Sequence, residues 1–288
     1  IFFYYKIQYF DFDLIVFLSL FFLLGLLTDL DYIKNPIFRF LFQILLLLFF
    51  LFYNDIAIND VRIEWFNLLL SNYYFNLFFV LFCFLVLING TNFIDGNNGI
   101  TLGYFLIIFT IIMNLINKDL IFYEINYLYP FLIVLIILLI FNLFNYLYLG
   151  DNGVYLLSLF SGYILIDIFT QNQNLSPYFI VNIFWYPAFE ILFSLIRKIK
   201  SKHSPLMPDT SHFHQLLFLF YSKKIDFNKK YINSITGVTI NLFNGIVLYL
   251  TSLNVNNTKI QILFLFGSLF IYLASYYILL KSKNYLEK

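Results

Sequence analysis

Residues 37–53 read IFRFLFQILLLLFFLFY, and this stretch decides the fold class. A helix that crosses the roughly 30 Å hydrocarbon core of a bilayer needs about 20 mostly apolar residues, and about 17 are tolerated. The stretch is long enough, and Arg39 is its only charged residue. We therefore predict a transmembrane helix over residues 37–53.

Apolar runs of the same kind recur along the whole chain. The predicted spans are centred on residues 12–27, 37–53, 74–89, 99–117, 126–148, 154–170, 178–196, 234–253 and 259–280. The sequence thus predicts an all-α, polytopic membrane helix bundle of about nine transmembrane helices, in a single domain over residues 1–288. Because the chain opens at Ile1, inside apolar sequence, we expect one or two further helices upstream, which would give ten or eleven.

The composition agrees with a membrane protein. The chain of 288 residues is 61% hydrophobic and 11% charged, whereas an average soluble domain is roughly 45–50% apolar and about 25% charged. A net charge of +1 gives no basic excess, so nucleic acid is not an expected partner. The single Cys83 excludes a disulfide framework and any multi-cysteine metal site.

The basic residues predict the orientation of the chain. When the loops are numbered alternately, thirteen Lys and Arg residues fall on one side of the membrane and four on the other. Basic residues near span ends favour the cytoplasmic side. We therefore expect a multi-pass protein of the bacterial inner (cell) membrane, with a basic, histidine-containing cytoplasmic loop over residues 197–233.

Four acidic sites fall on this predicted cytoplasmic face, in different parts of the sequence. They are the Thr28-Asp29-Leu30-Asp31 segment, Asp95, Asp151 and Asp209. Converging carboxylates suit Mg²⁺, which takes one or two carboxylates together with substrate phosphates. Histidines and cations of the 197–233 loop could bind phosphate oxygens through charge-assisted hydrogen bonds. The residues thus predict a cytoplasm-facing site for a metal and a phosphate-bearing ligand, and they leave the reaction open.

Four segments together carry a resemblance to a known family. They are Gly25–Asp31 with Asn35, Pro36 and Arg39; Asn89–Ile100; Leu149–Ser158; and Pro187–Ser194 running on to Pro205–Leu217. In this order and spacing the chain resembles the polyprenyl-phosphate sugar-1-phosphate transferases of glycosyltransferase family 4, which include the MraY-type and WecA-type membrane enzymes. The resemblance covers nearly the whole chain.

The resemblance implies a reaction, a cofactor and partners. Such enzymes move a sugar-1-phosphate from a UDP-sugar to a polyprenyl phosphate such as undecaprenyl phosphate, and they release UMP. For this chain we expect a UDP-N-acetylhexosamine as donor, membrane lipid as surroundings, and the start of a lipid-linked cell-surface glycan as product. The implied cofactor is Mg²⁺, with Mn²⁺ as an alternative, and a homodimer is compatible with the resemblance.

The resemblance also implies roles for single residues. Asp151 matches the aspartate that binds Mg²⁺, and Asp29, Asp95 and Asp151 form the expected catalytic set, with Asp29 as candidate base or second electrostatic contact. The expected substrate-binding residues are Asn89, Asn92, Asn98, His212 and His214. Glu190 also matches the family pattern and could hold a basic partner.

Structural interpretations of the same residues stay open. Asp is a favoured N-cap, so Asp151 could cap the helix that starts near Val154. Asn92 and Asp95 could form a turn between two spans, in which Asn and Asp side chains bond to nearby backbone. Asn89 could be a turn residue alone.

The chain departs from the family pattern at three positions. Thr28 replaces the first residue of an Asp pair, Asn98 replaces an Asp, and Gln215 replaces a His. A phosphomonoester has a second pKa near 6 and is mostly dianionic at pH 7, so the acceptor does not strictly need a base and Thr28 need not abolish activity. Asn98 and Gln215 fit members that act in surface-polysaccharide synthesis.

Three other functions remain as alternatives. A phospho-N-acetylmuramoyl-pentapeptide transferase of peptidoglycan synthesis is the second enzyme candidate, and Asn98 and Gln215 argue against it. A membrane transporter would place polar residues near the bilayer midplane in paired repeats, whereas here the carboxylates fall at one face. An inactive relative is suggested by Thr28.

Overall fold

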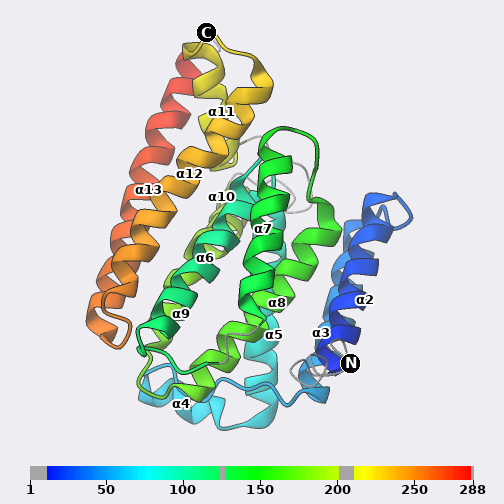
Figure 1. Cartoon of the computed structure of the whole chain (residues 1–288), viewed down its shortest axis with the longest axis vertical. Coiled ribbons are helices and arrows are strands. Elements are labelled where there is room, and N and C mark those ends of the chain that lie inside the picture. The colour runs from blue at the N-terminus through cyan, green and yellow to red at the C-terminus, as the bar shows by residue number, and fades with distance from the viewer. Residues whose placement is uncertain (1–11, 124–126, 201–210, 287–288) are drawn as a thin grey trace. The chain divides into compact units, whose positions relative to one another are not determined.

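The computed structural model describes residues 12–123, 127–200 and 211–286, and every regular element within these ranges is a helix (Figure 1). The helices are α2 (Phe12–Asp29), α3 (Pro36–Tyr53), α4 (Glu64–Leu70), α5 (Tyr73–Ile94), α6 (Ile100–Asn117), α7 (Leu128–Leu143), α8 (Gly150–Gln171), α9 (Pro177–Ile183), α10 (Trp185–Lys200), α11 (Phe213–Lys224), α12 (Lys229–Ser252) and α13 (Thr258–Leu286). The predicted all-α fold is confirmed.

Most of the predicted spans are single helices of membrane-crossing length. Among the described residues, seven helices are long and apolar enough: α2, α3, α5, α6, α8, α12 and α13. The helices α9 and α10 pass the same test as a pair, bent by 72°. The predicted span at 126–148 contains α7, an apolar helix of 16 residues. The chain is therefore a multi-pass membrane protein.

The bend between α9 and α10 has a cause in the sequence. Pro187 lacks a backbone N–H, so it cannot donate to the carbonyl of Ile183 four residues earlier. That carbonyl instead accepts a hydrogen bond from the hydroxyl of Tyr104, at 2.6 Å. The predicted continuous span at 178–196 is therefore two helices, and the freed carbonyl is satisfied by a side chain from α6.

Several predicted helix ends differ from the structure, among them those of α5 and α7. The helix α5 continues to Ile94, five residues beyond the predicted end, so the start of the Asn89–Ile100 segment is helical. The helix α7 ends at Leu143 because Asn142 donates its side-chain amide to the carbonyl of Leu147, at 2.9 Å, and Asn145 takes a left-handed φ of 62°. Asparagine tolerates this conformation better than most residues.

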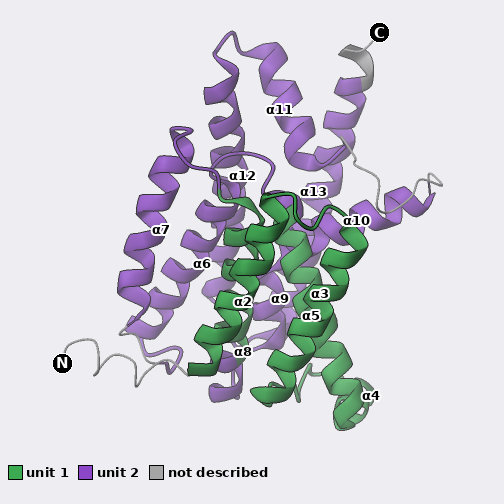
Figure 2. Ribbon diagram, turned by 90° about the vertical axis from the view of Figure 1, so that its right-hand side faces the viewer, with its two compact units in different colours: residues 1–92, 149–166 green, residues 93–148, 167–288 purple. Residues whose placement is uncertain are grey.

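The chain divides into two compact units, coloured separately in Figure 2. The first unit comprises residues 1–92 and 149–166, and the second comprises residues 93–148 and 167–288. One transferase domain over residues 1–288 stays a prediction. The predicted 197–233 loop contains the helix α11 and the start of α12, while its residues 201–210 lie outside the described ranges.

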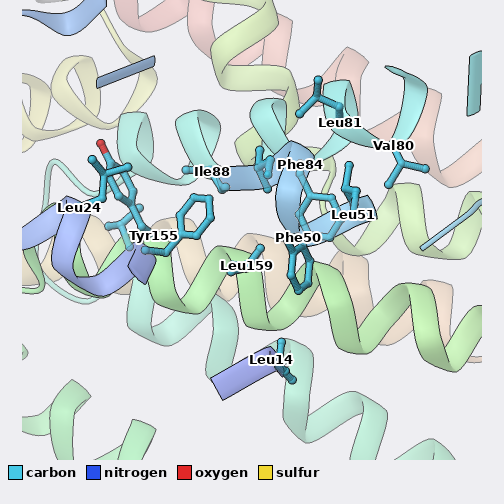
Figure 3. Packing of buried hydrophobic residues seen from close by; sticks show 13 residues of the cluster. Leu14, Leu24, Phe50, Leu51, Val80, Leu81, Phe84, Ile88, Tyr155 and Leu159 are labelled. Atoms are coloured by element: carbon cyan, nitrogen blue, oxygen red, sulfur yellow. The ribbon is translucent and has the colours of Figure 1, made fainter. Parts of the chain in front are cut away.

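The core of the first unit joins α2, α3, α5 and α8 through buried apolar side chains (Figure 3). Phe50 is fully buried, and its ring makes edge contacts with Phe17, Phe84 and Tyr163 at centroid distances of 5.3, 5.9 and 5.9 Å. One side chain from α3 thus contacts all three other helices of the core.

We expect Phe50→Ala to destabilise the protein, because it removes a ring that packs against three helices. Truncation of a buried Phe typically costs about 3–5 kcal/mol. Thermal unfolding of the detergent-purified protein should show a lower Tm. Phe52→Ala is the matched control, because Phe52 lies on the same helix and is 70% exposed. Equal loss of Tm in both variants would contradict this description of the core.

Candidate active site

Asp151, in the first turn of α8, is the centre of a polar cluster in the first unit. The Nη1 of Arg39 lies 3.2 Å from its Oδ2, and the Nδ2 of Asn92 donates to its Oδ1 at 2.6 Å. The hydroxyl of Tyr155, one turn further along α8, donates to Oδ2 at 3.3 Å. Three helices thus bring a cation, an amide and a phenol to one carboxylate.

Asp29, the last residue of α2, accepts hydrogen bonds from the start of α8. The backbone N–H of Asp151 donates to its Oδ1 at 3.0 Å, and that of Asn152 donates to its Oδ2 at 3.2 Å. The first N–H groups of a helix have no partner within the helix, and they carry partial positive charge. Asp29 therefore caps α8 from another helix and lies beside Asp151.

Two glycines allow this close approach of α2 to α8. Gly150 has a φ of +69°, and a Cβ at this position would lie 2.6 Å from the Oδ2 of Asp29. A Cβ at Gly25, one turn before Asp29 on α2, would overlap the backbone of Asn152. Gly25 and Gly150, from the first and third segments of the family pattern, thus leave the space in which these two helices touch.

Thr28, which replaces an aspartate of the family pattern, does not extend this cluster. Its side chain is buried, and its hydroxyl donates to the carbonyl of Leu24 within α2, at 3.0 Å. The hydroxyl is therefore engaged by its own helix. The substitution removes a carboxylate from the site without adding a new polar contact there.

Asn89, an expected substrate-binding residue, connects α5 to α3. Its Nδ2 donates to the Oε1 of Gln43 and to the carbonyl of Leu85, both at 2.9 Å. Gln43 lies one turn after Arg39 on α3, so this bond fixes the helix that carries the cation. Substrate contact by Asn89 stays a prediction, as it does for Asn92, whose amide binds Asp151.

Our reading of the sequence missed Arg39, Gln43 and Tyr155 as site residues. A signal for them was present in their spacing. Arg39 and Gln43 are four residues apart in an apolar helix, and so share one face of it. Tyr155 has the same spacing from Asp151. The contacts of Arg39 with Asp151 and of Gln43 with Asn89 depend on tertiary packing and could not be predicted from spacing.

The turn between α5 and α6, in the second unit, carries Asp95 and Asn98. Asn98 is 4% exposed, and its Nδ2 donates to the Oδ1 of Asn145 at 2.8 Å. Its backbone N–H donates to the Oδ1 of Asn233 at 3.3 Å, and that of Gly99 donates to Asn142. Side chains beyond the turn therefore hold it in place. Substrate contact by Asn98 and catalysis by Asp95 stay predictions.

His212 and His214, also in the second unit, lie at the start of α11. The two rings stack with centroids 5.7 Å apart and an angle of 8° between their planes. Both are buried, at 5% and 2% exposed. Gln215, which replaces a family histidine, accepts a hydrogen bond from the backbone N–H of His212 at 3.3 Å and so helps to cap the helix.

The His214 side chain is more deeply buried than that of His212. Burial lowers the pKa of His214 to about 4, with a further lowering by His212 and an opposing effect of Glu190. Its imidazole is therefore neutral at pH 7 and has one N–H donor. Its Nδ1 has no hydrogen-bond partner within the described part of the chain. His203 and Asp209 lie outside the described residues.

A magnesium ion fits the donor set at the start of α8. Within the described ranges, no group of three or more His, Cys, Asp or Glu side chains could hold a metal. Mg²⁺ does not need such a group, because it usually binds one or two carboxylates and completes its shell with substrate phosphates and water. Asp151, with Asp29 beside it, supplies hard oxygen ligands of this kind.

Comparison with known proteins identifies the family. Residues 12–169 match the family model described as glycosyl transferase family 4, which covers more than half of the chain. No curated protein matches the sequence. The chain belongs to glycosyl transferase family 4, as the four segments predicted, and it is a transferase. Membership of this family supports a function of the kind in which a sugar phosphate is transferred to a polyprenyl phosphate.

The matched range includes some of the expected site residues and leaves out others. It contains Asp29, Asp95 and Asp151, with the asparagines of the second segment, and it ends before His212 and His214. The family match therefore covers the three carboxylates of the expected catalytic set.

We expect Gly25→Ala to impair the site, because the added Cβ would overlap the backbone of Asn152 and push α2 away from α8. A misplacement of about 1 Å can cost roughly 100-fold in rate. The measurement is transfer activity together with the Tm of the purified protein. Gly267→Ala is the matched control, since a Cβ there meets nothing within 4 Å. Equal activity in the two variants would refute a requirement for the close contact at Gly25.

Proposed function

We propose that this chain transfers a sugar-1-phosphate from a UDP-sugar to a polyprenyl phosphate, releases UMP, and so starts a lipid-linked cell-surface glycan. The proposed donor is a UDP-N-acetylhexosamine, and the proposed acceptor is undecaprenyl phosphate at the cytoplasmic side of a bacterial inner membrane. The observation that carries the proposal is the Asp151 cluster in a chain of this family. It joins carboxylates, a cation and amide donors at one helix terminus.

The reaction exchanges one phosphorus–oxygen bond for another. An oxygen of the polyprenyl phosphate attacks the sugar-bearing phosphorus of the UDP-sugar, and the bond from that phosphorus to the UMP oxygen breaks. Such an in-line displacement depends mainly on positioning and on compensation of negative charge. The attacking phosphate is mostly dianionic at pH 7, so no proton has to be removed from it.

The contacts of Asp29 fit this chemistry. Both carboxylate oxygens accept backbone N–H groups of α8, which assigns Asp29 the task of holding the start of α8 in place. A carboxylate has further lone pairs, so Asp29 can also act as the second electrostatic contact. We therefore favour this role over that of general base.

The remaining groups of the cluster supply charge and hydrogen bonds. Arg39 is proposed to bind a phosphate group, because a guanidinium is suited to bidentate contact with phosphate oxygens. Asn92 orients Asp151 through its amide. Asp151, with Asp29, would hold Mg²⁺, which when bound offsets the repulsion between the two anionic substrates. His212 and His214 are proposed as diphosphate contacts, on the resemblance alone.

An assay with labelled substrates tests the function. Membranes that contain the protein are incubated with a labelled UDP-sugar, polyprenyl phosphate and Mg²⁺, and lipid-linked label is counted. Transfer from a UDP-N-acetylhexosamine is the expected result. Transfer from UDP-MurNAc-pentapeptide alone would instead make the protein a peptidoglycan-precursor transferase. No transfer from any donor, where a related enzyme is active, would refute the proposal.

We expect Asp151→Asn to lower the transfer rate by about 100-fold or more, because it removes the charge that several groups of the cluster contact. The Tm and the elution volume of the purified variant should stay close to those of the wild type. Asp60→Asn is the matched control, since Asp60 forms an ion pair with Arg62 at 2.9 Å and accepts a hydrogen bond from Asn67, and neither partner is an expected site residue. Wild-type turnover by Asp151→Asn would remove this residue from the site.

A further inference from the structure

We infer that Glu190 is a positioning residue for His212: its carboxylate keeps the hydrogen on Nδ1 and leaves Nε2 as the ring nitrogen that can contact substrate. The inference deepens the proposed function and rests on it. Its basis is a group of contacts within the second unit that joins α10, α11 and α13.

Glu190 is a deeply buried acid whose carboxylate contacts three hydrogen-bonding groups. Its side chain lies in α10 and is 2% exposed. The Oε1 lies 3.0 Å from the Nδ1 of His212 and accepts the backbone N–H of Phe213 at 3.1 Å. The Oε2 accepts the hydroxyl of Tyr272, from α13. An acid so far from water needs partners of this kind, because an unpaired buried charge is very costly.

The hydrogen-bond inventory decides the form of His212. An ionised carboxylate can only accept hydrogen bonds. The backbone N–H of Phe213 and the hydroxyl of Tyr272 act as donors, so the third group in contact with Glu190, the Nδ1 of His212, must carry hydrogen as well. The second ring nitrogen, Nε2, is then the one through which His212 can act on a ligand.

The ring contacts fix the plane of the imidazole. His212 stacks on Phe93, with centroids 5.2 Å apart and planes 27° apart, and on His214 at 5.7 Å. A tilt of the ring would break these stacking contacts, and a 180° flip within the same plane would break the bond to Glu190. The position of Nε2 is therefore determined by Glu190, Phe93 and His214, of which Glu190 and His214 are buried.

A functional role explains this arrangement better than stability does. A buried ion pair often contributes little net stability compared with apolar residues of the same size. In metal sites and catalytic sites, by contrast, a carboxylate commonly orients a histidine and sets its tautomer.

Asp167 is a second carboxylate of this unit, and its hydrogen-bond donors are neutral side chains. It accepts hydrogen bonds from the hydroxyl of Tyr123 and from the side-chain amide of Gln171, at 3.0 Å each. Asp167 therefore serves as a control for the loss of a tyrosine–carboxylate bond.

A double-mutant cycle tests the inference through activity. Glu190→Gln keeps the size of the side chain and one acceptor oxygen, and we expect it to lower kcat about 10- to 100-fold. In a His212→Asn background the same change should alter kcat by less than about 2-fold, because residues that act as a unit are not additive. The control Asp167→Asn should retain wild-type activity. Equal fold losses in both backgrounds would overturn the inference.

Nitrogen NMR of the imidazole rings tests the same point without activity. The chain has 3 histidines, so ring-¹⁵N-histidine labelling gives few signals, and the loss of one signal in His212→Asn assigns His212. We expect hydrogen on Nδ1 of His212 in the wild type and a mixture of tautomers in Glu190→Gln. If Glu190→Gln does not fold, Tyr272→Phe, which removes one donor to Glu190, should shift the same signal.

The outcomes separate this inference from the proposed function. A neutral His212 with hydrogen on Nε2 alone in the wild type would overturn the inference, whatever the protein catalyses. If the wild type transfers no sugar phosphate while Nδ1 of His212 carries hydrogen, the proposed function fails and the tautomer assignment stands. If the wild type is active and the cycle is additive, the inference alone fails.

Discussion

The two hydrogen bonds from the start of α8 to the carboxylate of Asp29 are the contact on which the candidate site depends. The first backbone N–H groups of a helix have no acceptor within the helix, so they need partners from outside it. Asp29 supplies them from α2, and Gly25 and Gly150 leave the space that it needs. The same contact places Asp151 where Arg39 and Asn92 reach it.

Hydrogen-bond and ionic partners from neighbouring helices stabilise the acids of a chain in which 11% of the residues are charged. In the first unit Asp151 lies beside Arg39, and in the second unit Glu190 lies beside His212. An ionisable group that is withdrawn from water is costly unless a partner compensates it. Each unit therefore contains an acid held by side chains from neighbouring helices, and both acids belong to segments of the family pattern.

Helix type and approximate position could be predicted from apolar runs alone, as residues 37–53 show: the helix there is Pro36–Tyr53. The bend near Pro187 has a signal in the sequence, the proline itself, whereas the bond from Tyr104 that satisfies the carbonyl of Ile183 depends on tertiary packing. The sequence predicted a helix start near Val154, and α8 begins four residues earlier, at Gly150, with Asp151 in its first turn. Sequence reasoning missed Arg39 as the partner of Asp151. It expected Glu190 to hold a basic partner, and His212, from the predicted cytoplasmic loop, is the residue that Glu190 contacts.

The most direct test of the account is Mn²⁺ electron paramagnetic resonance on the purified protein, with Mn²⁺ in the place of Mg²⁺. We predict that the wild type binds Mn²⁺ and that addition of a UDP-sugar produces ³¹P hyperfine coupling to the bound ion. Asp151→Asn should lose both signals while it remains folded. Unchanged Mn²⁺ binding and the same ³¹P coupling in Asp151→Asn would contradict the assignment of Asp151 as the centre of the site.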